Sequence, residues 1–210
     1  MTDGGLDVVW TDATERLRDD PAFGPLVEEV GPVRIRRPGP EHFPLLCRSI
    51  VYQQLAGRAA STIHGRFVDA VGGEVRPATV LGVEEDELRA AGLSKNKVRA
   101  VRDLAQKVAS GEVLLDGIEG RTDEEVATAL TRVWGVGRWT ADMFLLFQLR
   151  RADVWPTGDL GVRNGFARVM GWDEAPSAGE LELAGIGYRP WRSAVAWYCW
   201  RAVEVLTPGG

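Results

Sequence analysis

Apolar side chains recur at helical spacing along most of the chain after Glu41. Phe43, Leu46 and Ile50 lie at positions i, i+3 and i+7, which is the spacing of one face of an α-helix. No stretch alternates strongly enough between apolar and polar residues to be a central strand. The pattern therefore predicts an all-α fold of about nine or ten helices joined by short loops. Besides the helix from residue 41, the predicted helices are residues 58–71, 77–81, 84–90, 95–110, 122–133, 138–149, 159–170 and 189–206.

Capping residues mark several predicted helix ends. Ser94 precedes the helix at 95–110 and is predicted as its N-cap. Thr122 followed by Glu125 matches a capping box, in which each side chain bonds the backbone N–H of the other residue. The helical pattern is interrupted at residues 53–57, and this interruption predicts a turn between two helices.

The first forty residues carry a different pattern. Residues 1–20 are polar and acidic and predict at most a loosely held helix. Residues 21–40 contain five prolines, which favour a packed loop or a short strand over a helix. Because forty residues are too few for a separate core, we expect no additional N-terminal domain.

A glycine-rich turn, VWGVGRWTA (133–141), joins two of the predicted helices. A G-x-G pair lets the backbone turn sharply with its N–H groups bare, and N–H groups at a helix N-terminus suit a phosphate. Taken alone, this pattern is equally typical of a structural turn. Asp159 lies at the start of a later predicted helix, where an Asp is usually only an N-cap.

The turn resembles the hairpin of the helix-hairpin-helix DNA glycosylases, roughly L-P-G-[VI]-G-x-x-T-A, except that Trp134 stands where Pro is usual. Three further segments agree in the same order, IVYQQLAGRAA (50–60), GLSKNKVRAVRDLA (92–105) and RPWRSAVAWYCW (189–200). The chain is most similar to the 3-methyladenine DNA glycosylase II type, over about residues 40–206. The resemblance implies a two-lobed fold with the active site in the cleft between the lobes. One lobe would hold residues 1–74 and 171–210, and the other, with the hairpin, residues 75–170.

The resemblance also implies an activity, which is flipping and hydrolytic excision of alkylated bases, such as 3-methyladenine, from duplex DNA. Asp159, in the segment DLGVR, matches the catalytic Asp of the family, which stabilises the oxocarbenium-like sugar and helps to position water. Trp139 occupies the position of the Schiff-base Lys of bifunctional relatives. Without an amine there, no imine with the sugar is available at this position, so the enzyme should be monofunctional.

The resemblance implies a base pocket of four side chains, Tyr52, Trp139, Met143 and Trp191. An indole at residue 139 would stack on a cationic purine. Met143 stands where the family often has an aromatic residue. The resemblance therefore does not predict which damaged bases the pocket accepts. Trp191 has the alternative interpretation of a core residue.

The implied DNA contacts lie in several segments. Gln54 is the predicted wedge that fills the gap left by a flipped base, with Leu55 as the second choice and two exposed Gln in a turn as the plain alternative. Hairpin N–H groups and the Thr140 hydroxyl are expected to hold phosphates. The predicted phosphate and backbone contacts are Gly135, Gly137, Thr140, Arg163 and Arg192.

The charge distribution supports a nucleic-acid partner although the net charge is −5. Residues 1–30 hold eight acids and two Arg, whereas residues 31–66 hold six Arg and one Glu. Residues 130–170 hold six Arg and three Asp. Basic charge thus gathers on the segments that carry the motifs, unless these Arg belong to ordinary solvated helix faces.

Cofactor expectations follow from the few metal-binding residues. Cys47 and Cys199 are too few for a four-Cys iron–sulfur cluster and are predicted to be buried free thiols, and neither His lies in a metal-binding pattern. The resemblance implies a monovalent cation, Na⁺ or K⁺, at the backbone carbonyls of Thr131, Val133 and Val136. With no signal peptide and no run of eighteen apolar residues, we expect a cytoplasmic monomer with no membrane partner.

Two alternative functions remain open. One is a sister glycosylase for oxidised, deaminated or mismatched bases, which Trp139 and the missing cluster cysteines disfavour. The other is a noncatalytic helix-hairpin-helix DNA-binding module, which Asp159 in register with the family motif disfavours.

Overall fold

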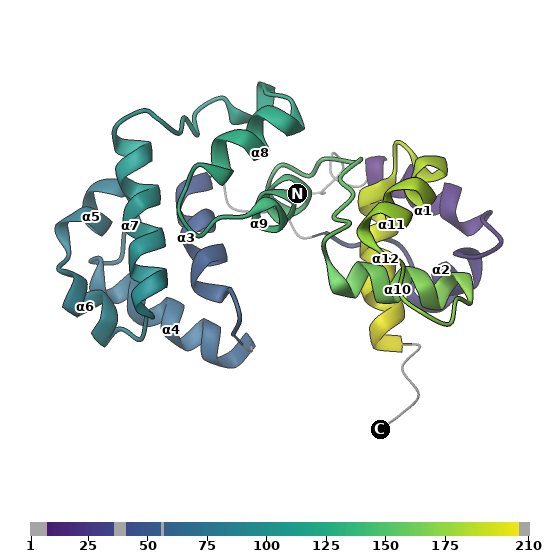
Figure 1. The fold of residues 1–210 in the computed structure, drawn as a ribbon, viewed down its shortest axis with the longest axis horizontal. Coiled ribbons are helices and arrows are strands. Elements are labelled where there is room, and N and C mark those ends of the chain that lie inside the picture. The colour runs from purple at the N-terminus through teal and green to yellow at the C-terminus, as the bar shows by residue number, and fades with distance from the viewer. Residues whose placement is uncertain (1–7, 36–40, 56, 206–210) are drawn as a thin grey trace, which may run out of the picture. The chain divides into compact units, whose positions relative to one another are not determined.

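The computed structural model of the chain describes residues 8–35, 41–55 and 57–205. Within these ranges all regular structure is helical, so the predicted all-α fold is confirmed (Figure 1). The chain falls into two compact units. The first unit lies within Met1–Arg37 and Leu145–Gly210, and the second lies within Pro38–Phe144.

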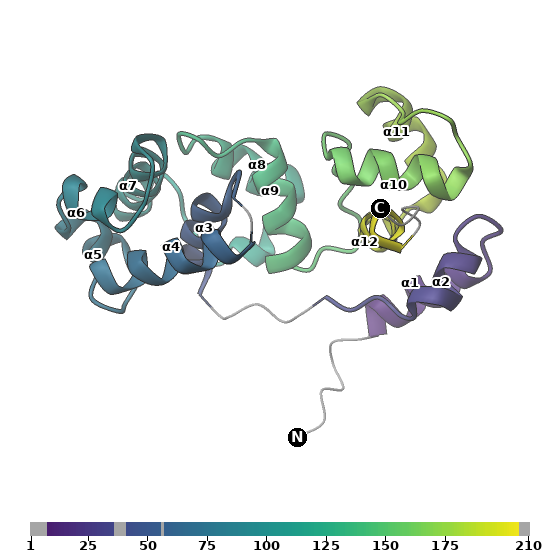
Figure 2. The ribbon, with the colours of Figure 1, turned by 90° about the horizontal axis from the view of Figure 1, so that it is seen from below.

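The second unit is built around helix α7 (Lys95–Ala109), which lies against α3 (His42–Tyr52) and α5 (Pro77–Gly82) (Figures 1 and 2). α7 forms because apolar residues face inward at helical spacing and Ser94 caps its start by accepting from the Lys97 N–H at 3.3 Å. The unit also contains α4 (Gly57–Ala70), α6 (Glu85–Ala90), a 3₁₀ turn (Ile118–Gly120), α8 (Asp123–Thr131) and α9 (Arg138–Met143).

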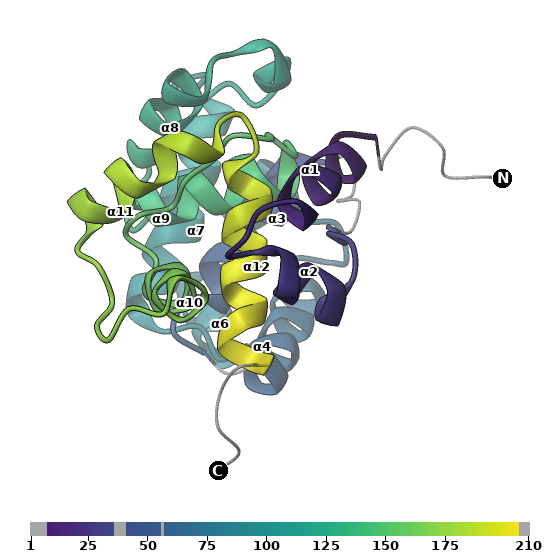
Figure 3. The same ribbon diagram turned by 90° about the vertical axis from the view of Figure 1, so that its right-hand side faces the viewer.

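The first unit is built around helix α12 (Arg192–Val205). Figure 3 shows α12 running between α10 (Leu160–Met170) on one side and α1 (Val8–Arg18) and α2 (Gly24–Val30) on the other. Its remaining elements are α11 (Ala178–Ala184) and a 3₁₀ turn (Gly185–Tyr188). A π-helical turn (Phe144–Gln148) directly follows α9 in the chain.

Close packing in the first unit depends on Gly165. A Cβ atom built on Gly165 would lie 1.9 Å from the carbonyl oxygen of Cys199, so the two helix backbones meet where α10 has no side chain. Cys199 and Cys47 are fully buried free thiols, as predicted, and burial raises the pKa of both.

Several predicted details are confirmed. The turn expected at residues 53–57 separates α3 from α4. The capping box at α8 is present, with the Thr122 N–H bonded to Glu125 Oε2 at 2.8 Å and the Glu125 N–H bonded to Thr122 Oγ1 at 3.3 Å. Asp159 caps α10.

The expectation of a loop or strand at residues 21–40 is wrong for residues 24–30, which form α2. Pro25 stands in the first turn of this helix, where a backbone N–H has no intrahelical acceptor and proline is tolerated. The N-terminal helix is also better packed than expected, because Trp10 and Leu17 are buried. Residues 36–40 lie outside the described residues.

The unit boundaries differ from the expected lobes. Residues 41–74 belong with the hairpin because α3 and α4 pack on α7 and α6, and residues 145–170 belong with the chain ends because α10 packs on α12. In the part of the chain that the structure describes, no helix is long and apolar enough to cross a membrane.

Candidate functional site

The Asp159 carboxylate is held by two donors from different helices of the first unit. Its Oδ1 accepts from the Val162 N–H at 2.8 Å, which makes Asp159 the N-cap of α10. The same oxygen accepts from the indole Nε1 of Trp200, on α12, at 3.0 Å. The Trp200 ring is in turn stacked on Phe147, with 5.6 Å between ring centroids. The carboxylate is therefore oriented by tertiary packing as well as by the helix that it caps.

Gly161 makes room for this arrangement. A Cβ atom at residue 161 would lie 2.9 Å from the Trp200 ring and 3.1 Å from Asp159 Oδ1. A larger residue would therefore push the indole away from the carboxylate. The sequence interpretation missed both Gly161 and Trp200. A glycine in the first turn of an otherwise apolar helix was the available signal, because glycine there is unfavourable unless space requires it.

The two hairpin glycines of the second unit have different roles. Gly135 has φ +79°, a conformation that other residues adopt only with strain, and a Cβ atom there would lie 3.3 Å from the Cβ of Ala100. Gly137 has φ −96°, and a Cβ atom there would meet nothing within 4 Å. The fold therefore requires glycine at 135. At 137 it does not, and the missing side chain leaves the backbone open to the approach of another molecule.

A cavity of about 470 Å³ lies in the second unit. It brings together six residues that the sequence interpretation proposed from two separate segments, residues 52–55 and 139–143. Its lining comprises Arg48, Ser49, Tyr52, Gln53, Gln54, Leu55, Trp139, Thr140 and Met143. Trp139 is 46% exposed, so its indole presents a large apolar surface at this cavity.

The Tyr52 ring, which lines this cavity, already has the positively charged Arg48 side chain against it. The Arg48 guanidinium lies 4.3 Å from the centroid of the Tyr52 ring, and His64 contacts the same ring edge-on at 6.0 Å. Burial, and next the charge of Arg48, lower the pKa of His64. Because Arg48 occupies one face of the Tyr52 ring and adds positive charge beside it, Trp139 is the better candidate of the two for stacking on a positively charged base.

The turn between α3 and α4 is tied to the hairpin by Gln53. Its side-chain amide donates to the Gly135 carbonyl at 3.2 Å and to Thr140 Oγ1 at 3.3 Å. Thr140 is only 4% exposed, and its hydroxyl oxygen accepts this local bond, so little of the side chain reaches the surface for the phosphate contact that was expected. The next residue, Gln54, is exposed and has φ +56°, and Leu55 is exposed beside it.

The family model of the HhH-GPD superfamily base excision DNA repair proteins matches residues 47–186, more than half of the chain. The chain is a member of that superfamily. This membership confirms the resemblance inferred from the hairpin and its three companion segments.

Individual glycosylases are also similar to this chain over most of their length. DNA-3-methyladenine glycosylase 1 of Schizosaccharomyces pombe is 32% identical over 185 residues, which cover 86% of this chain and 81% of that protein. The structure of the S. pombe 3-methyladenine DNA glycosylase in complex with abasic DNA matches with TM-score 0.82 and 28% identity, covering 95% of this chain and 100% of that one. A DNA-3-methyladenine glycosidase from Bacillus halodurans matches with TM-score 0.80 and 32% identity, covering 96% and 89%.

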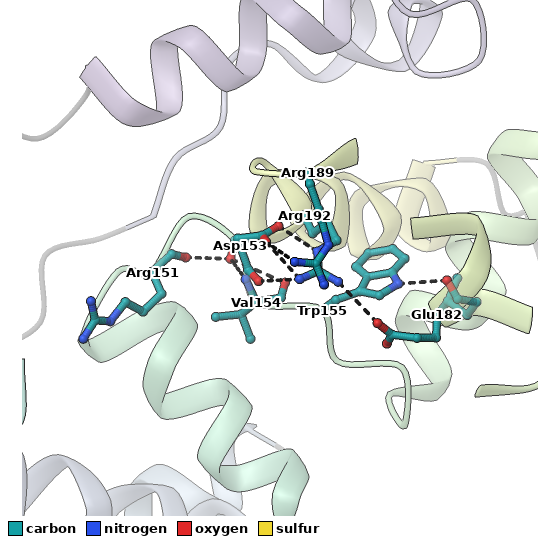
Figure 4. A network of polar contacts seen from close by, with 9 residues as sticks. Arg151, Asp153, Val154, Trp155, Glu182, Arg189 and Arg192 are labelled. Carbon is teal, nitrogen blue, oxygen red and sulfur yellow. Dashed lines mark hydrogen bonds and ion pairs between the residues drawn. The ribbon is translucent and has the colours of Figure 1, made fainter. Parts of the chain in front are cut away.

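Arg192 has a different role from the DNA contact that was expected of this HhH-GPD chain. It is 6% exposed, and its guanidinium forms a paired contact with Asp153 at 2.7 and 2.9 Å and a longer one with Glu182 at 3.4 Å (Figure 4). The neighbouring Ser193 accepts from the Val154 N–H at 2.9 Å and donates to the Arg151 carbonyl at 2.6 Å. These contacts hold the loop that precedes Asp159. The Arg192 guanidinium is buried and already paired with Asp153, so it is not available to a phosphate.

Two other predicted residues of the first unit also have local partners. Trp191 lines a small cavity of about 30 Å³ with Arg16, Leu17 and Tyr188, and does not line the Trp139 cavity. Arg163 donates through Nε to the Pro176 carbonyl at 2.6 Å and so holds the connection between α10 and α11.

The carbonyls expected to hold a monovalent cation lie at the end of α8, for Thr131, and in the hairpin turn, for Val133 and Val136. The Val136 N–H donates to the Val133 carbonyl at 3.0 Å, which leaves that oxygen a second lone pair. Trp134 in place of proline removes no carbonyl, so the three oxygens expected to bind the cation, those of Thr131, Val133 and Val136, are all present in this chain. Within the described ranges, no group of three or more His, Cys, Asp or Glu could hold a metal ion.

Proposed function

We propose that this chain is a monofunctional DNA glycosylase that flips alkylated bases, such as 3-methyladenine, out of duplex DNA and removes them by hydrolysis. The observation that carries the proposal is the oriented Asp159 carboxylate, which lies within the residues that the superfamily model matches. Relatives that are similar over most of the chain are named 3-methyladenine DNA glycosylases, which favours alkylated bases as substrates.

The reaction breaks the bond between a base nitrogen and the sugar C1′, and positive charge develops on the sugar. A fixed anion at Asp159 would stabilise that charge. An alkylated purine already carries positive charge, so it leaves without much help from a general acid. The exposed indole of Trp139 would stack on the cationic base.

The substrate of this reaction is DNA. The hairpin is the part of the protein that we propose to contact the DNA phosphates. Backbone N–H groups at residues 135, 137, 139 and 140 would hold a phosphate next to the lesion. A Na⁺ or K⁺ ion on the carbonyls of Thr131, Val133 and Val136 would add positive charge at the same turn.

Incubation of the protein with methylated duplex DNA tests the proposal. Mass spectrometry of the released bases should find 3-methyladenine. Release of oxidised or deaminated bases instead would indicate the sister class of glycosylase. Binding of DNA without release of any base would indicate a noncatalytic DNA-binding protein.

We expect no lyase activity. The chain contains three Lys, of which Lys97 donates to the Val51 carbonyl at 2.7 Å and Lys107 donates to Asp103 at 2.9 Å. With Trp139 at the Schiff-base position, borohydride should trap no covalent protein–DNA adduct during base release. The product strand should be cut only after alkali or an abasic endonuclease is added. A trapped adduct would show that another amine forms the imine.

Gln54→Gly tests the proposed wedge. Glycine adopts the φ of +56° at this turn without strain, so the variant should fold at least as stably as the wild type. Excision from duplex DNA should fall on the order of tenfold more than excision from an unpaired lesion, because a wedge assists only the flipping step. Single-turnover rates on the two substrates provide the measurement. Leu55→Gly is the matched comparison, and equal losses on both substrates for Gln54→Gly would exclude the wedge role.

A further inference from the structure

Helix α7 contacts the tip of the hairpin through Asp103. Its Oδ2 accepts from the Trp134 backbone N–H at 2.7 Å, across a sequence separation of 31 residues. Both carboxylate oxygens also accept from Lys107 Nζ, at 3.1 and 2.9 Å. The Asp103 side chain is 28% exposed, so these contacts are partly buried. The bond to Lys107 is an ion pair, and the bond from the Trp134 N–H is made to a charged acceptor.

The side chain of Trp134 contacts the same helix. The Arg99 guanidinium lies 4.2 Å from the centroid of the indole ring. Arg99 and Asp103 are four residues apart and share one face of α7, and Ala100 of that helix lies against Gly135. Two consecutive hairpin residues are thus held from one helix face, through a backbone N–H, an aromatic ring and a glycine.

The charges around Asp103 favour its ionised form. Burial by itself would raise the pKa of Asp103, but the bonds from Lys107 and the Trp134 N–H, with the charges of Lys107 and Arg99, outweigh it and lower the pKa. An ionised carboxylate is a stronger acceptor than a neutral one, and a partly buried N–H without any acceptor is costly. The side chain at residue 103 therefore has a direct effect on the conformation of the hairpin tip.

We propose that Asp103 is a positioning residue for DNA binding, which fixes the hairpin tip by holding the Trp134 N–H. The inference rests on the proposed function, because the hairpin is the element assigned to phosphate. Asp103 touches neither the base nor the sugar in this role. It acts through Trp134 and Gly135 on the backbone N–H groups that follow them.

Asp103→Ala removes the acceptor and should release the hairpin tip. By NMR hydrogen exchange, the Trp134 amide should lose about tenfold or more of its protection. The dissociation constant for a duplex with an abasic analogue should rise about tenfold, with the single-turnover rate at saturating DNA little changed. Removal of a negative charge alone would tighten binding to DNA, so weaker binding reports lost positioning. Asp103→Asn, which keeps an acceptor oxygen, should bind close to wild type, and Asp116→Ala serves as the charge-matched exposed control.

Proline at residue 134 provides the decisive comparison, because it removes the N–H that Asp103 holds and is the usual residue at this place in the motif. In the Trp134→Pro background, Asp103→Ala should no longer weaken DNA binding. An equal loss in both backgrounds, or an unchanged Trp134 amide in Asp103→Ala, would overturn the proposal. A wild-type protein that binds no DNA would instead refute the proposed function, and the amide exchange would still show whether Asp103 holds the hairpin.

Discussion

Asp159→Asn should lower the single-turnover rate of base release by a factor of several hundred while the protein stays folded. The expected loss corresponds to about 3–4 kcal/mol of transition-state stabilisation, which is typical for removal of one preorganised electrostatic group. The substitution removes the negative charge and little else. Asparagine keeps an oxygen that can accept from the Val162 N–H and from the Trp200 indole, and it caps helices about as well as aspartate.

Thermal melting and single-turnover kinetics on the same methylated duplex separate catalysis from capping. Ser177→Ala is the matched control in the first unit, because Ser177 caps α11 through the Glu180 N–H at 3.3 Å. This control should lose about 1 kcal/mol of stability and keep its rate of base release. Binding of Asp159→Asn to abasic-analogue DNA should survive. A folded Asn variant that releases base at the wild-type rate would make Asp159 a cap only and would favour a noncatalytic DNA-binding protein.

Gly165→Ala should destabilise the protein by about 3 kcal/mol or more, the largest stability effect that we expect from a single methyl group. The added Cβ atom would lie 1.9 Å from the Cys199 carbonyl oxygen and 2.7 Å from its Cα atom. These are backbone atoms of α12, so no side-chain rotation relieves the clash. The helices α10 and α12 must separate, and tight packing makes such a shift costly.

Thermal unfolding should show this loss as a fall of roughly 10 °C in the midpoint. Gly179→Ala is the matched control, because Gly179 lies in α11 with nothing within 4 Å of a Cβ position. Alanine there should stabilise the helix by a few tenths of a kcal/mol up to about 1 kcal/mol. A Gly165→Ala protein with the same unfolding midpoint as the wild type would contradict the close contact between α10 and α12.

The Gly165 contact also matters for the candidate active site. α10 begins at the Asp159 cap and α12 carries Trp200, so the distance between these helices sets the bond between the two side chains. Gly161 and Gly165 lie on the face of α10 that meets α12. The catalytic proposal for Asp159 thus depends on two glycines that have no chemistry of their own.

The helices that the sequence predicted are those with strong local signals. Ser94, Thr122 and Glu125 act within three residues of their partners, so their capping roles follow from residue type and spacing. α2 was missed because its proline was interpreted as a helix breaker and not as a first-turn residue. α11 was missed although Ser177 and Glu180 form a readable capping box.

The resemblance to the family predicted more of the site residues than residue spacing alone could. The resemblance assigned Tyr52, Trp139 and Met143 to the base pocket and Gln54 to the wedge, and the structure places all four at one cavity. Arg192 was misjudged because a basic residue in a motif segment is equally suited to a phosphate and to a buried acid. Only the position of Asp153 distinguishes the two roles.

By itself the sequence determined the all-α class, the turn between α3 and α4, the glycine hairpin and the capping position of Asp159. Each of these depends on residue types within one or two helical turns, where spacing fixes which groups meet. Only the tertiary structure decided that Trp200 orients Asp159, that Gln53 ties the turn to Thr140 and that Asp103 holds Trp134. These partners are 41, 87 and 31 residues apart. Contacts over such separations arise from how helices pack, and no local pattern of side chains encodes them.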